Sequence, residues 1–282
     1  MRVMVTGSSG MLGHEVVAAA LARGWECVAL ERAQLDVTDA RAVDAVLAEQ
    51  RPDALVNCAA WTDVDTAQSS EAAAAAVNGA GAGNLARAAL GAGARLVHVS
   101  TDYVFDGLAH RPYVESDPPG PRTAYGRTKL AGEQAVLAAS PEHAVVRTAW
   151  LFGPAGRNFV ATMLGLAAAG RDEVAVVTDQ IGCPTFAGHL AQRLLDVAAA
   201  SGGGLFHAAG AGHCSWNDFA RAIFEAAGLD VRVTATTSAQ MSRPAPRPAW
   251  SVLASERGIE PLPPWRQGLA AHLAALAQET AR

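Results

Sequence analysis

The sequence predicts an α/β protein with a doubly wound parallel sheet and a smaller, discontinuous α/β domain. Short apolar runs alternate with helical runs through the first half of the chain, which is typical of parallel strands joined by helices that cover both faces of a sheet. A glycine-rich turn separates the first predicted strand from the first helix. After Gly153 the alternation becomes irregular, so we expect the second half to fold mainly as a separate, smaller unit.

The first strand is predicted at residues 2–6, and the glycine-rich turn follows directly. Glycine stands at positions 7, 10 and 13, where it lets the backbone turn tightly and approach a phosphate. The helix that follows, through Arg23, would present free N–H groups and a positive dipole end to that phosphate. This G-x-x-G-x-x-G turn therefore predicts a dinucleotide site of the Rossmann kind, formed by Gly7, Ser9, Gly10, Met11, Leu12 and Gly13.

The second strand, residues 26–30, ends in two charged residues with opposite implications. Glu31 would hold a ribose 2′-hydroxyl and favour NADH, whereas Arg32 would hold a 2′-phosphate and favour NADPH. The sequence leaves this choice open. Thr38 is expected to cap a helix at 40–50. Further strands are expected at 54–58 and 95–99, with a long alanine-rich helix at 71–92.

Ligands of such sheets bind beyond the C-terminal ends of the strands, where Asp36, Ala59 and Thr101 are expected. The helix predicted at 124–139 carries Tyr125 and Lys129 four residues apart, and hence on one face. At roughly 5 Å and an effective dielectric of about 20, a tyrosinate and an ammonium attract by about 3 kcal/mol. That attraction would lower the pKa of Tyr125 by about 2 units. Thr101, Tyr125 and Lys129 then make a compact proton-transfer unit.

The second half is predicted from less regular patterns. Helices are expected at 158–169, 185–200, 216–227 and 265–278, and strands at 174–177, which could return to the main sheet, and 205–208. Ser215 is a plausible N-cap, and residues 242–248 are too proline-rich for a helix or strand interior. We therefore expect a dinucleotide-binding domain at 1–150 with returning pieces around 172–200, a substrate domain mainly at 151–282, and a site in the cleft between them.

The composition excludes several classes of protein. The 282 residues are 50% hydrophobic and 17% charged, with a net charge of -5, as in soluble globular proteins. No dense basic run suggests nucleic acid or a membrane surface as a partner. No apolar run of about 20 residues and no signal-like start are present, so we expect a cytoplasmic protein. The scattered cysteines and histidines have no metal-ligand spacing, so no metal site is predicted.

Several motifs resemble those of the extended short-chain dehydrogenase/reductase family. They are T-G-x-x-G-x-x-G at 6–13, a Ser or Thr after the fourth strand, and Y-x-x-x-K at 125–129. More narrowly, the chain resembles the dTDP-4-dehydrorhamnose reductase subfamily nearly end to end. The stretches that carry this are L-D-V-T-D at 35–39, N-C-A-A-W-T-D-V-D at 57–65, S-T-D-Y-V-F-D-G at 100–107, R-T-A-W-L-F-G at 147–153, D-Q-I-G-C-P-T at 179–185, C-S-W-N-D-F-A at 214–220 and R-P-A-P-R-P-A-W-S-V-L at 243–253.

The resemblance implies reduction of the 4-keto group of a dTDP-linked 6-deoxy-L-sugar by hydride from NADPH or NADH. It implies that Tyr125 donates the proton, that Lys129 holds the nicotinamide ribose, and that Thr101 completes the catalytic set. Asp36 and Val37 would flank the adenine, and Ala59, Ala60 and Thr62 would lie along the nicotinamide. The substrate-side residues would be Val64, Thr101, Asp102, Tyr103 and Trp150 around the sugar, with Asn158, Arg243 and Arg247 for the diphosphate and nucleoside.

One difference separates this chain from nucleotide-sugar 4,6-dehydratases, which the layout also resembles. Those enzymes carry T-D-E where this chain has Thr101, Asp102 and Tyr103. The elimination machinery is thus incomplete, and Asp102 is expected to be a structural hydrogen-bonding residue.

Two alternatives stay open. The chain could be a reductase of another nucleotide-linked 4-ketosugar in a specialised deoxysugar pathway, or a non-catalytic regulatory subunit on the same scaffold. The intact Thr101, Tyr125 and Lys129 set favours an enzyme. The sequence specifies no oligomeric state. Some relatives place a magnesium ion at a dimer interface, but no carboxylate pattern here supports one.

Overall fold

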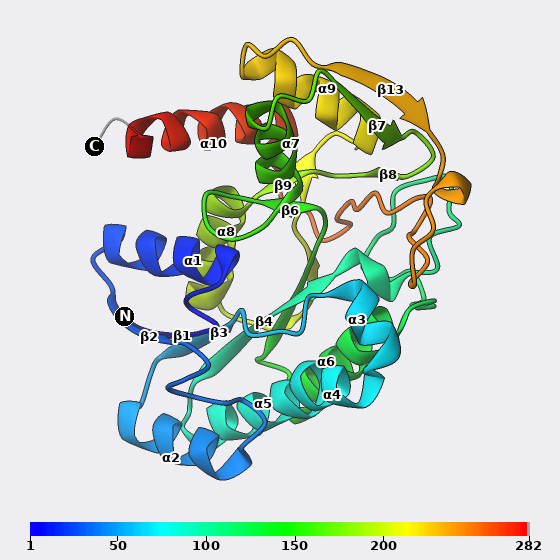
Figure 1. Ribbon diagram of the computed structural model, residues 1–282. Helices are drawn as coiled ribbons and strands as arrows, with labels where there is room; N and C mark the ends of the chain where they lie inside the picture. Colours follow the sequence, from blue (N-terminus) through cyan, green and yellow to red (C-terminus); the bar gives the residue numbers. More distant parts are fainter. Residues whose placement is uncertain (281–282) are drawn as a thin grey trace.

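A six-stranded parallel sheet lies at the centre of the computed structural model, which describes residues 1–280 (Figure 1). The strand order is β10-β5-β4-β3-β1-β2, and every neighbouring pair is parallel. The predicted doubly wound sheet is therefore confirmed. The strands are β1 (Arg2–Thr6), β2 (Glu26–Leu30), β3 (Ala54–Asn57), β4 (Arg95–Thr101), β5 (Ala144–Thr148) and β10 (Gly204–His207).

Helices cover both faces of the sheet because successive strand residues point to opposite sides. Val3 and Val5 face α1 (Met11–Ala22) and α8 (Ala187–Ala199) in one buried apolar cluster. Met4, between them in sequence, faces the opposite cluster, to which α2, α5 and α6 contribute. These three helices span Ala40–Gln50, Ala82–Gly91 and Ala124–Ala139. Both faces of the sheet are therefore buried beneath helices, as is typical of parallel sheets.

Two local expectations in the first half need correction. Asp39, not Thr38, caps α2, because its Oδ1 accepts from the N–H groups of Arg41 (3.0 Å) and Ala42 (3.1 Å). The helix expected at 71–92 is interrupted: α4 (Glu71–Ala75) continues through a π-helical segment (Ala76–Gly81) into α5. The short helix α3 (Val64–Ser69) and strand β5 were not predicted.

Within residues 151–280 the second half forms four two-stranded sheets. Three helices, α7, α9 and α10, pack around a core that includes Phe152, Phe219 and Ile223. Ser215 caps α9 in a capping box, as predicted. The pairs are β6 (Leu151–Phe152) with β9 (Thr185–Phe186), β7 (Glu173–Val177) with β13 (Arg232–Thr236), β8 (Ile181–Gly182) with β12 (Cys214–Ser215), and β11 (Gly210–Ala211) with β14 (Leu262–Pro264); the helices span Phe159–Ala168, Trp216–Ala226 and Trp265–Thr280.

The strand expected at 174–177 does not return to the main sheet. It pairs in parallel with β13, about sixty residues later, and the returning strand is β10, beside β5. The helix expected at 185–200 begins at Ala187, after the short strand β9. None of the helices within residues 1–280 combines the length and apolar character that crossing a bilayer needs.

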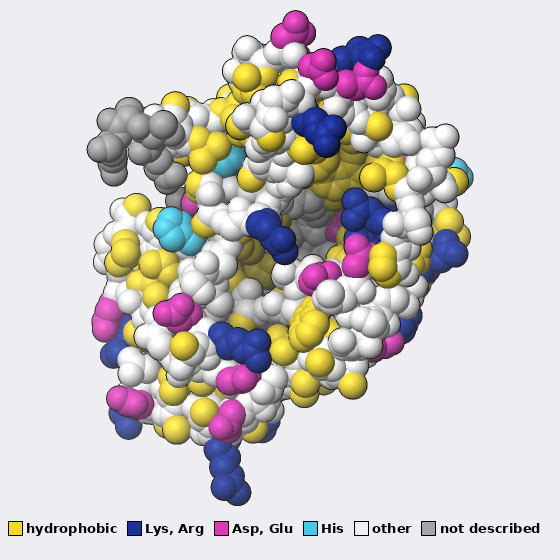
Figure 2. Space-filling model, viewed as in Figure 1, with side chains coloured by type: hydrophobic (Ala, Val, Ile, Leu, Met, Phe, Trp, Pro, Cys, Tyr) yellow, Lys and Arg dark blue, Asp and Glu magenta, His cyan; other side chains and the backbone are white. Residues whose placement is uncertain are grey.

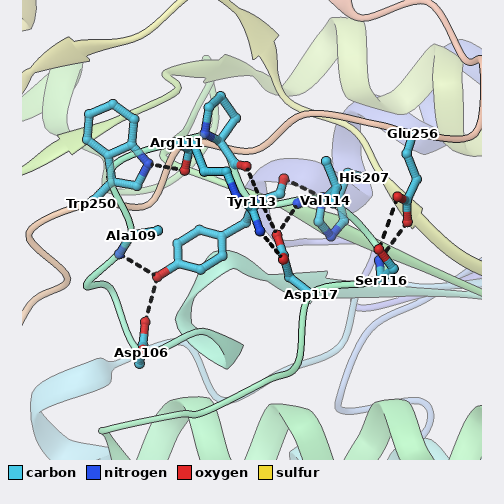
Figure 3. Close-up of polar contacts among 11 residues, drawn as sticks. Asp106, Ala109, Arg111, Tyr113, Val114, Ser116, Asp117, His207, Trp250 and Glu256 are labelled. Carbon is cyan, nitrogen blue, oxygen red and sulfur yellow. Dashed lines mark hydrogen bonds and ion pairs between the residues drawn. The ribbon is translucent and has the colours of Figure 1, made fainter.

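The connection between β4 and α6 fastens the two halves together (Figure 3). Tyr113 Oη donates to Asp106 Oδ1 at 2.6 Å within this connection. Trp250 Nε1, in the second half, donates to the Arg111 carbonyl at 2.8 Å. The Ser116 N–H donates to Glu256 at 2.8 Å. The chain before α6 is therefore held against the chain around residues 250–256.

Candidate active site

A cleft of about 940 Å³ opens at the ends of the central strands, between the two halves of the chain. Figure 2 shows this hollow with lysine or arginine side chains around its rim. Its volume is near the top of the range of about 300–1,000 Å³ for ligand pockets. Among the predicted site residues, those lining it are Gly7, Ser9, Gly10, Met11, Leu12, Gly13, Arg32, Asp36, Val37, Ala59, Ala60, Thr62, Val64, Thr101, Asp102, Tyr103, Tyr125, Lys129, Trp150, Arg243 and Arg247. Glu31 and Asn158 do not line it.

The glycine turn forms one end of the cleft and can exist only with glycine at two positions. Gly7 has φ +69°, and a Cβ there would lie 2.7 Å from the Ala59 nitrogen. A Cβ on Gly13 would lie 2.1 Å from the Gly7 carbonyl oxygen. No side chain within residues 1–280 caps the start of α1. Its first N–H groups are therefore left for an anionic ligand.

The end of β2 shapes the neighbouring part of the cleft. The Arg32 side chain is 84% exposed, and its guanidinium lies 3.9 Å from Asp36 Oδ2. Asp36 also accepts hydrogen bonds from the N–H and hydroxyl of Thr38, at 2.9 and 2.8 Å. These two bonds lower the pKa of Asp36. Of the two residues with opposite coenzyme preferences, Arg32 lines the cleft and Glu31 does not.

Two buried asparagines fix the loop after β3, where Ala59, Ala60 and Thr62 line the cleft. Asn57 Oδ1 accepts from the Ala59 N–H at 3.0 Å. Asn78 Oδ1 accepts from the Trp61 N–H at 2.8 Å, and its amide nitrogen donates to the Trp61 carbonyl at 3.1 Å. Asn78 lies in the π-helical segment, a distortion often found at functional sites. The wall of the cleft is therefore held by side chains behind it.

Tyr125 and Lys129 project from the first turns of α6, whose start is capped by Thr123. The Tyr125 phenol and the Thr101 hydroxyl are hydrogen-bonded. Thr101 Oγ1 also donates to Asp102 Oδ1 at 2.9 Å. Burial raises the pKa of Asp102 to about 6, against the opposing hydrogen bonds of Ser251 and Thr101. The end of β4 and the start of α6 thus bring a linked set of hydroxyls to the cleft.

The expected lowering of the Tyr125 pKa is wrong for this form of the protein. Burial raises the pKa of Tyr125 to about 12, and its hydrogen bond with Thr101 only partly opposes the rise. Lys129 does not oppose it, because its amino group is turned toward the strand and donates to the Val99 carbonyl at 2.7 Å. Burial lowers the pKa of Lys129 itself to about 8. The four-residue spacing correctly predicted that Tyr125 and Lys129 share a helix face, but it could not predict where the Lys129 amino group points.

Aromatic rings also line the cleft. Trp150 stacks on Trp216 with ring centroids 3.6 Å apart and an angle of 6° between planes. Trp150 has φ +46°, one of two positive φ values among the described non-glycine residues, and such backbone is costly unless its surroundings enforce it. Gly182 permits it, since a Cβ there would lie 2.3 Å from the Trp150 ring. Tyr103 and Tyr125 meet edge to face at 5.5 Å.

Two arginines from the proline-rich segment enter the cleft, and both are held by one carboxylate. Arg247 donates to both oxygens of Asp65, at 2.9 and 2.8 Å, and Arg243 lies 3.7 Å from the same group. Asp65 belongs to α3, so this contact spans the two halves. Asn158, the third expected anion contact, instead caps α7: its Oδ1 accepts from the Ala161 N–H at 3.0 Å. Its polar side chain is used by the helix start.

Several cleft residues were not predicted. Arg157 lines the cleft just after Gly156, a turn residue with φ +73°. A basic residue next to a glycine turn is a sequence signal that could have identified Arg157 as a candidate anion contact. Trp216 begins an amphipathic helix, where an aromatic residue looks the same as a core residue. Lys129 is the only lysine in the sequence. Residues 1–280 contain no group of three or more His, Cys, Asp or Glu that could hold a metal ion.

Comparisons with known proteins show which family the chain belongs to. Residues 1–278 match the family model described as "RmlD substrate binding domain". A dTDP-4-dehydrorhamnose reductase of Streptomyces griseus is 49% identical, covering 100% of this chain and 96% of the relative. A Streptomyces antibioticus relative described as a probable dTDP-4,6-dihydroxy-2-methyloxan-3-one 4-ketoreductase is also 49% identical, covering 95% and 93%. The crystal structure of dTDP-4-dehydrorhamnose reductase from Bacillus anthracis in complex with NADP has 36% identity, a TM-score of 0.94, and coverage of 97% and 99%.

Proposed function

Because the chain belongs to the RmlD substrate binding domain family, we propose that it is an NAD(P)H-dependent oxidoreductase that reduces the 4-keto group of dTDP-4-dehydrorhamnose to give dTDP-L-rhamnose. The observation that carries this is one cleft lined by both the glycine turn and the Thr101, Tyr125 and Lys129 set. Relatives named for this reaction, with nearly full coverage of both chains, support it. The intact set also disfavours the non-catalytic alternative.

The residues of the set take distinct roles in this proposal. The bound coenzyme supplies the hydride. Tyr125 is protonated at neutral pH because burial raises its pKa to about 12, so it serves as the acid that donates a proton to the former keto oxygen. Thr101, hydrogen-bonded to Tyr125, holds that oxygen in line. Lys129, at the floor of the cleft, holds the ribose hydroxyls next to the nicotinamide.

The coenzyme lies across the ends of β1, β2 and β3 in this proposal. Backbone N–H groups of the glycine turn hold its diphosphate, Asp36 and Val37 flank its adenine, and Ala59, Ala60 and Thr62 line its nicotinamide side. Arg32 is the residue for a 2′-phosphate, since it lines the cleft and Glu31 does not. We therefore propose a preference for NADPH. The similar Bacillus anthracis enzyme in complex with NADP supports this choice.

The sugar nucleotide occupies the second half of the cleft. Trp150 and Trp216 offer flat apolar surface to the deoxysugar, with Val64 and Tyr103 beside them. Arg243 and Arg247 suit the diphosphate, because a guanidinium fork matches paired oxygens. Arg157, on the opposite loop, is an added candidate. Asn158 has no part in this proposal, because it caps α7.

We propose a corresponding division of the chain. Residues 1–150 form the coenzyme unit, with α8 and β10 as returning pieces, and the remainder of 151–282 forms the substrate unit. The packing of α8 beside α1 on the same face of the sheet and the pairing of β10 with β5 support this division.

A second candidate function is reduction of another dTDP-linked ketosugar in a specialised pathway. The Streptomyces antibioticus relative named for such a ketoreduction is as similar to this chain as the reductase from Streptomyces griseus. The two candidates share every catalytic residue. The shape of the pocket between Trp150 and Val64 would separate them.

The test is coenzyme oxidation with defined sugars. Purified protein is mixed with NADPH or NADH and enzymatically prepared dTDP-4-dehydrorhamnose, absorbance at 340 nm is followed, and the product is identified. Rapid oxidation that yields dTDP-L-rhamnose supports the first function. Oxidation only with a different dTDP-4-ketosugar would transfer the assignment to the second. Coenzyme binding with no oxidation of either sugar would contradict both.

A further inference from the structure

A chain of buried polar side chains lies behind Lys129, on the side away from the cleft. Asn57 and His98 are respectively 2% and 0% exposed, and neither lines the cleft. Asn57 Nδ2 lies 2.9 Å from His98 Nδ1. His98 Nε2 lies 3.3 Å from Lys129 Nζ. The proposed reaction leaves both of these side chains without a role.

The orientation of the Asn57 amide is fixed by the backbone. Asn57 Oδ1 faces the Ala59 N–H at 3.0 Å and the Thr6 hydroxyl at 2.7 Å. A backbone N–H can only donate, so the amide atom that it meets must be the oxygen. The amide nitrogen therefore points to His98, and an amide nitrogen can only donate.

The fixed amide in turn fixes the tautomer of His98. Since Asn57 donates to Nδ1, this nitrogen must carry the lone pair, and a neutral imidazole must carry its proton on Nε2. The buried ring is neutral, because burial holds the pKa of His98 well below its usual value. The resulting Nε2–H points at Lys129 Nζ. An ammonium has no lone pair to accept it, whereas a neutral amine can accept it and still donate to the Val99 carbonyl at 2.7 Å.

We propose that Asn57 and His98 are positioning residues that present a hydrogen-bond donor to Lys129 and thereby stabilise its neutral amine more than the surroundings of an ordinary lysine do. The lysine would then exchange its proton near neutral pH, instead of remaining charged as an ordinary lysine does.

The other ionisable groups that face Lys129 do not remove this preference. Glu133, one turn further along α6, favours the ammonium, but its carboxylate is engaged by Arg147 at 2.9 and 2.7 Å and by the Ser100 hydroxyl. Cys58, after β3, has a pKa raised to about 12 by burial, so its thiol is uncharged. The lowering of the Lys129 pKa to about 8 agrees with the geometry.

The consequence for catalysis rests on the proposed function. After Tyr125 gives its proton to the sugar, the resulting tyrosinate must regain one before the next turnover. A lysine that gains and loses a proton near neutral pH can supply it through the ribose hydroxyls that Lys129 holds in that proposal and regain one from solvent, whereas a permanently charged lysine cannot.

The single lysine makes a direct measurement possible. Protein labelled with ¹³C-lysine gives one ε-carbon signal, so its pH titration reports the pKa of Lys129 alone. We expect a midpoint well below the ordinary lysine value of about 10.4. Long-range ¹⁵N–¹H correlation on the histidines reports the tautomer of His98 in the same coenzyme-free protein, with the His98→Gln variant assigning its signals.

Asn57→Asp is the sharpest variant, because it changes an amide donor into an acceptor of nearly the same shape. The carboxylate would accept from Nδ1–H, the tautomer of His98 would switch, and Nε2 would accept from the Lys129 ammonium. We expect the Lys129 midpoint to rise by at least about one unit. His143→Gln is the matched control: His143 also accepts at Nδ1 from a backbone N–H, that of Leu96 at 3.2 Å, but it does not contact Lys129.

Two results would overturn the proposal. One is a wild-type His98 with its proton on Nδ1, which needs no variant to fold. The other is a Lys129 midpoint that Asn57→Asp and His98→Gln change no more than His143→Gln does. None of these measurements uses the sugar substrate, so a failure of the proposed function would leave them readable. If the function holds, both variants should also move the alkaline limb of kcat upward.

Discussion

The two walls of the cleft differ in the residue types that form them. The coenzyme wall is rich in glycines, alanines and backbone at the ends of parallel strands, and Asn57 and Asn78 hold it from behind. The substrate wall consists of tryptophans and arginines on short elements and loops. The first wall suits a diphosphate that needs close backbone approach, and the second suits a group that must be recognised by shape and charge. We expect substitutions to have their largest effect on catalysis where the two walls meet.

Tyr125 lies where the two walls meet, and Tyr125→Phe should have the largest effect on turnover. Loss of the proton donor should lower kcat by about 100-fold or more, with coenzyme affinity nearly unchanged, because the phenyl ring keeps its contact with Tyr103. Steady-state kinetics and coenzyme titration measure the two. Tyr113→Phe is the control, since Tyr113 bonds Asp106 outside the cleft. A Tyr125→Phe enzyme with normal turnover would remove the assigned role.

Gly13→Ala should disturb the coenzyme wall alone and weaken coenzyme binding. The new methyl would lie 2.1 Å from the Gly7 oxygen, so the turn must shift, at a cost of about 1–3 kcal/mol. Coenzyme affinity should fall about tenfold or more. Gly165→Ala, in α7 with nothing within 4 Å of the added methyl, should instead stabilise the fold by up to about 1 kcal/mol. Thermal unfolding and coenzyme titration of both variants measure this contrast; equal behaviour would refute it.

Arg247→Ala should disturb the substrate wall alone and weaken binding of the sugar nucleotide. A charged hydrogen bond is worth about 1.5–3 kcal/mol, so KM for the sugar nucleotide should rise about tenfold or more while coenzyme affinity stays the same. The variant also leaves Asp65 with one fewer partner. Arg247→Lys keeps the charge but not the fork and should recover only part of the loss. Arg87→Ala, at a surface pair with Asp44, is the control. A higher coenzyme Kd would contradict the division between walls.

Arg32→Ala should give the smallest effect, because the side chain is exposed. Exposed ion pairs contribute about 0.2–1 kcal/mol, so the ratio of kcat/KM for NADPH to that for NADH should fall by up to about fivefold. Kinetics with both coenzymes measure the ratio, and Arg41→Ala on α2 is the control. An unchanged ratio would assign the choice of coenzyme to other residues.

The contrast between the walls also explains how much the sequence could predict. In the coenzyme unit strands and helices alternate in the regular order of a doubly wound sheet. Alternation and glycine spacing were therefore enough to predict β1 to β4, α6 and the glycine turn, although β1 and β3 pair across about 50 residues. In the second half, β7 pairs with β13 and β8 with β12 across 30 to 60 residues, and no local pattern records such pairing. The expected return of residues 174–177 to the main sheet was wrong for this reason.

Side-chain direction was the other limit. Asn158 was a reasonable anion contact by residue type, but in the folded protein its side-chain oxygen caps α7. The Tyr125 and Lys129 spacing was correctly placed on one helix, yet burial and the turn of the amino group toward Val99 reversed the expected pKa shift. Periodicity locates a residue on an element and leaves its partners across the fold undetermined.

The solitary lysine at the floor of the cleft has a consequence for covalent chemistry. The sequence has 22 lysines and arginines together, and all but Lys129 are arginines. Within this sequence, reagents that acylate lysine amines can therefore react only with Lys129, a residue that is 2% exposed. Acylation of that amine reports directly on how open the cleft is, and a bound ligand that covers it should protect it. Acylation of Lys129 can thus be used to count functional sites in a preparation, without background from surface lysines.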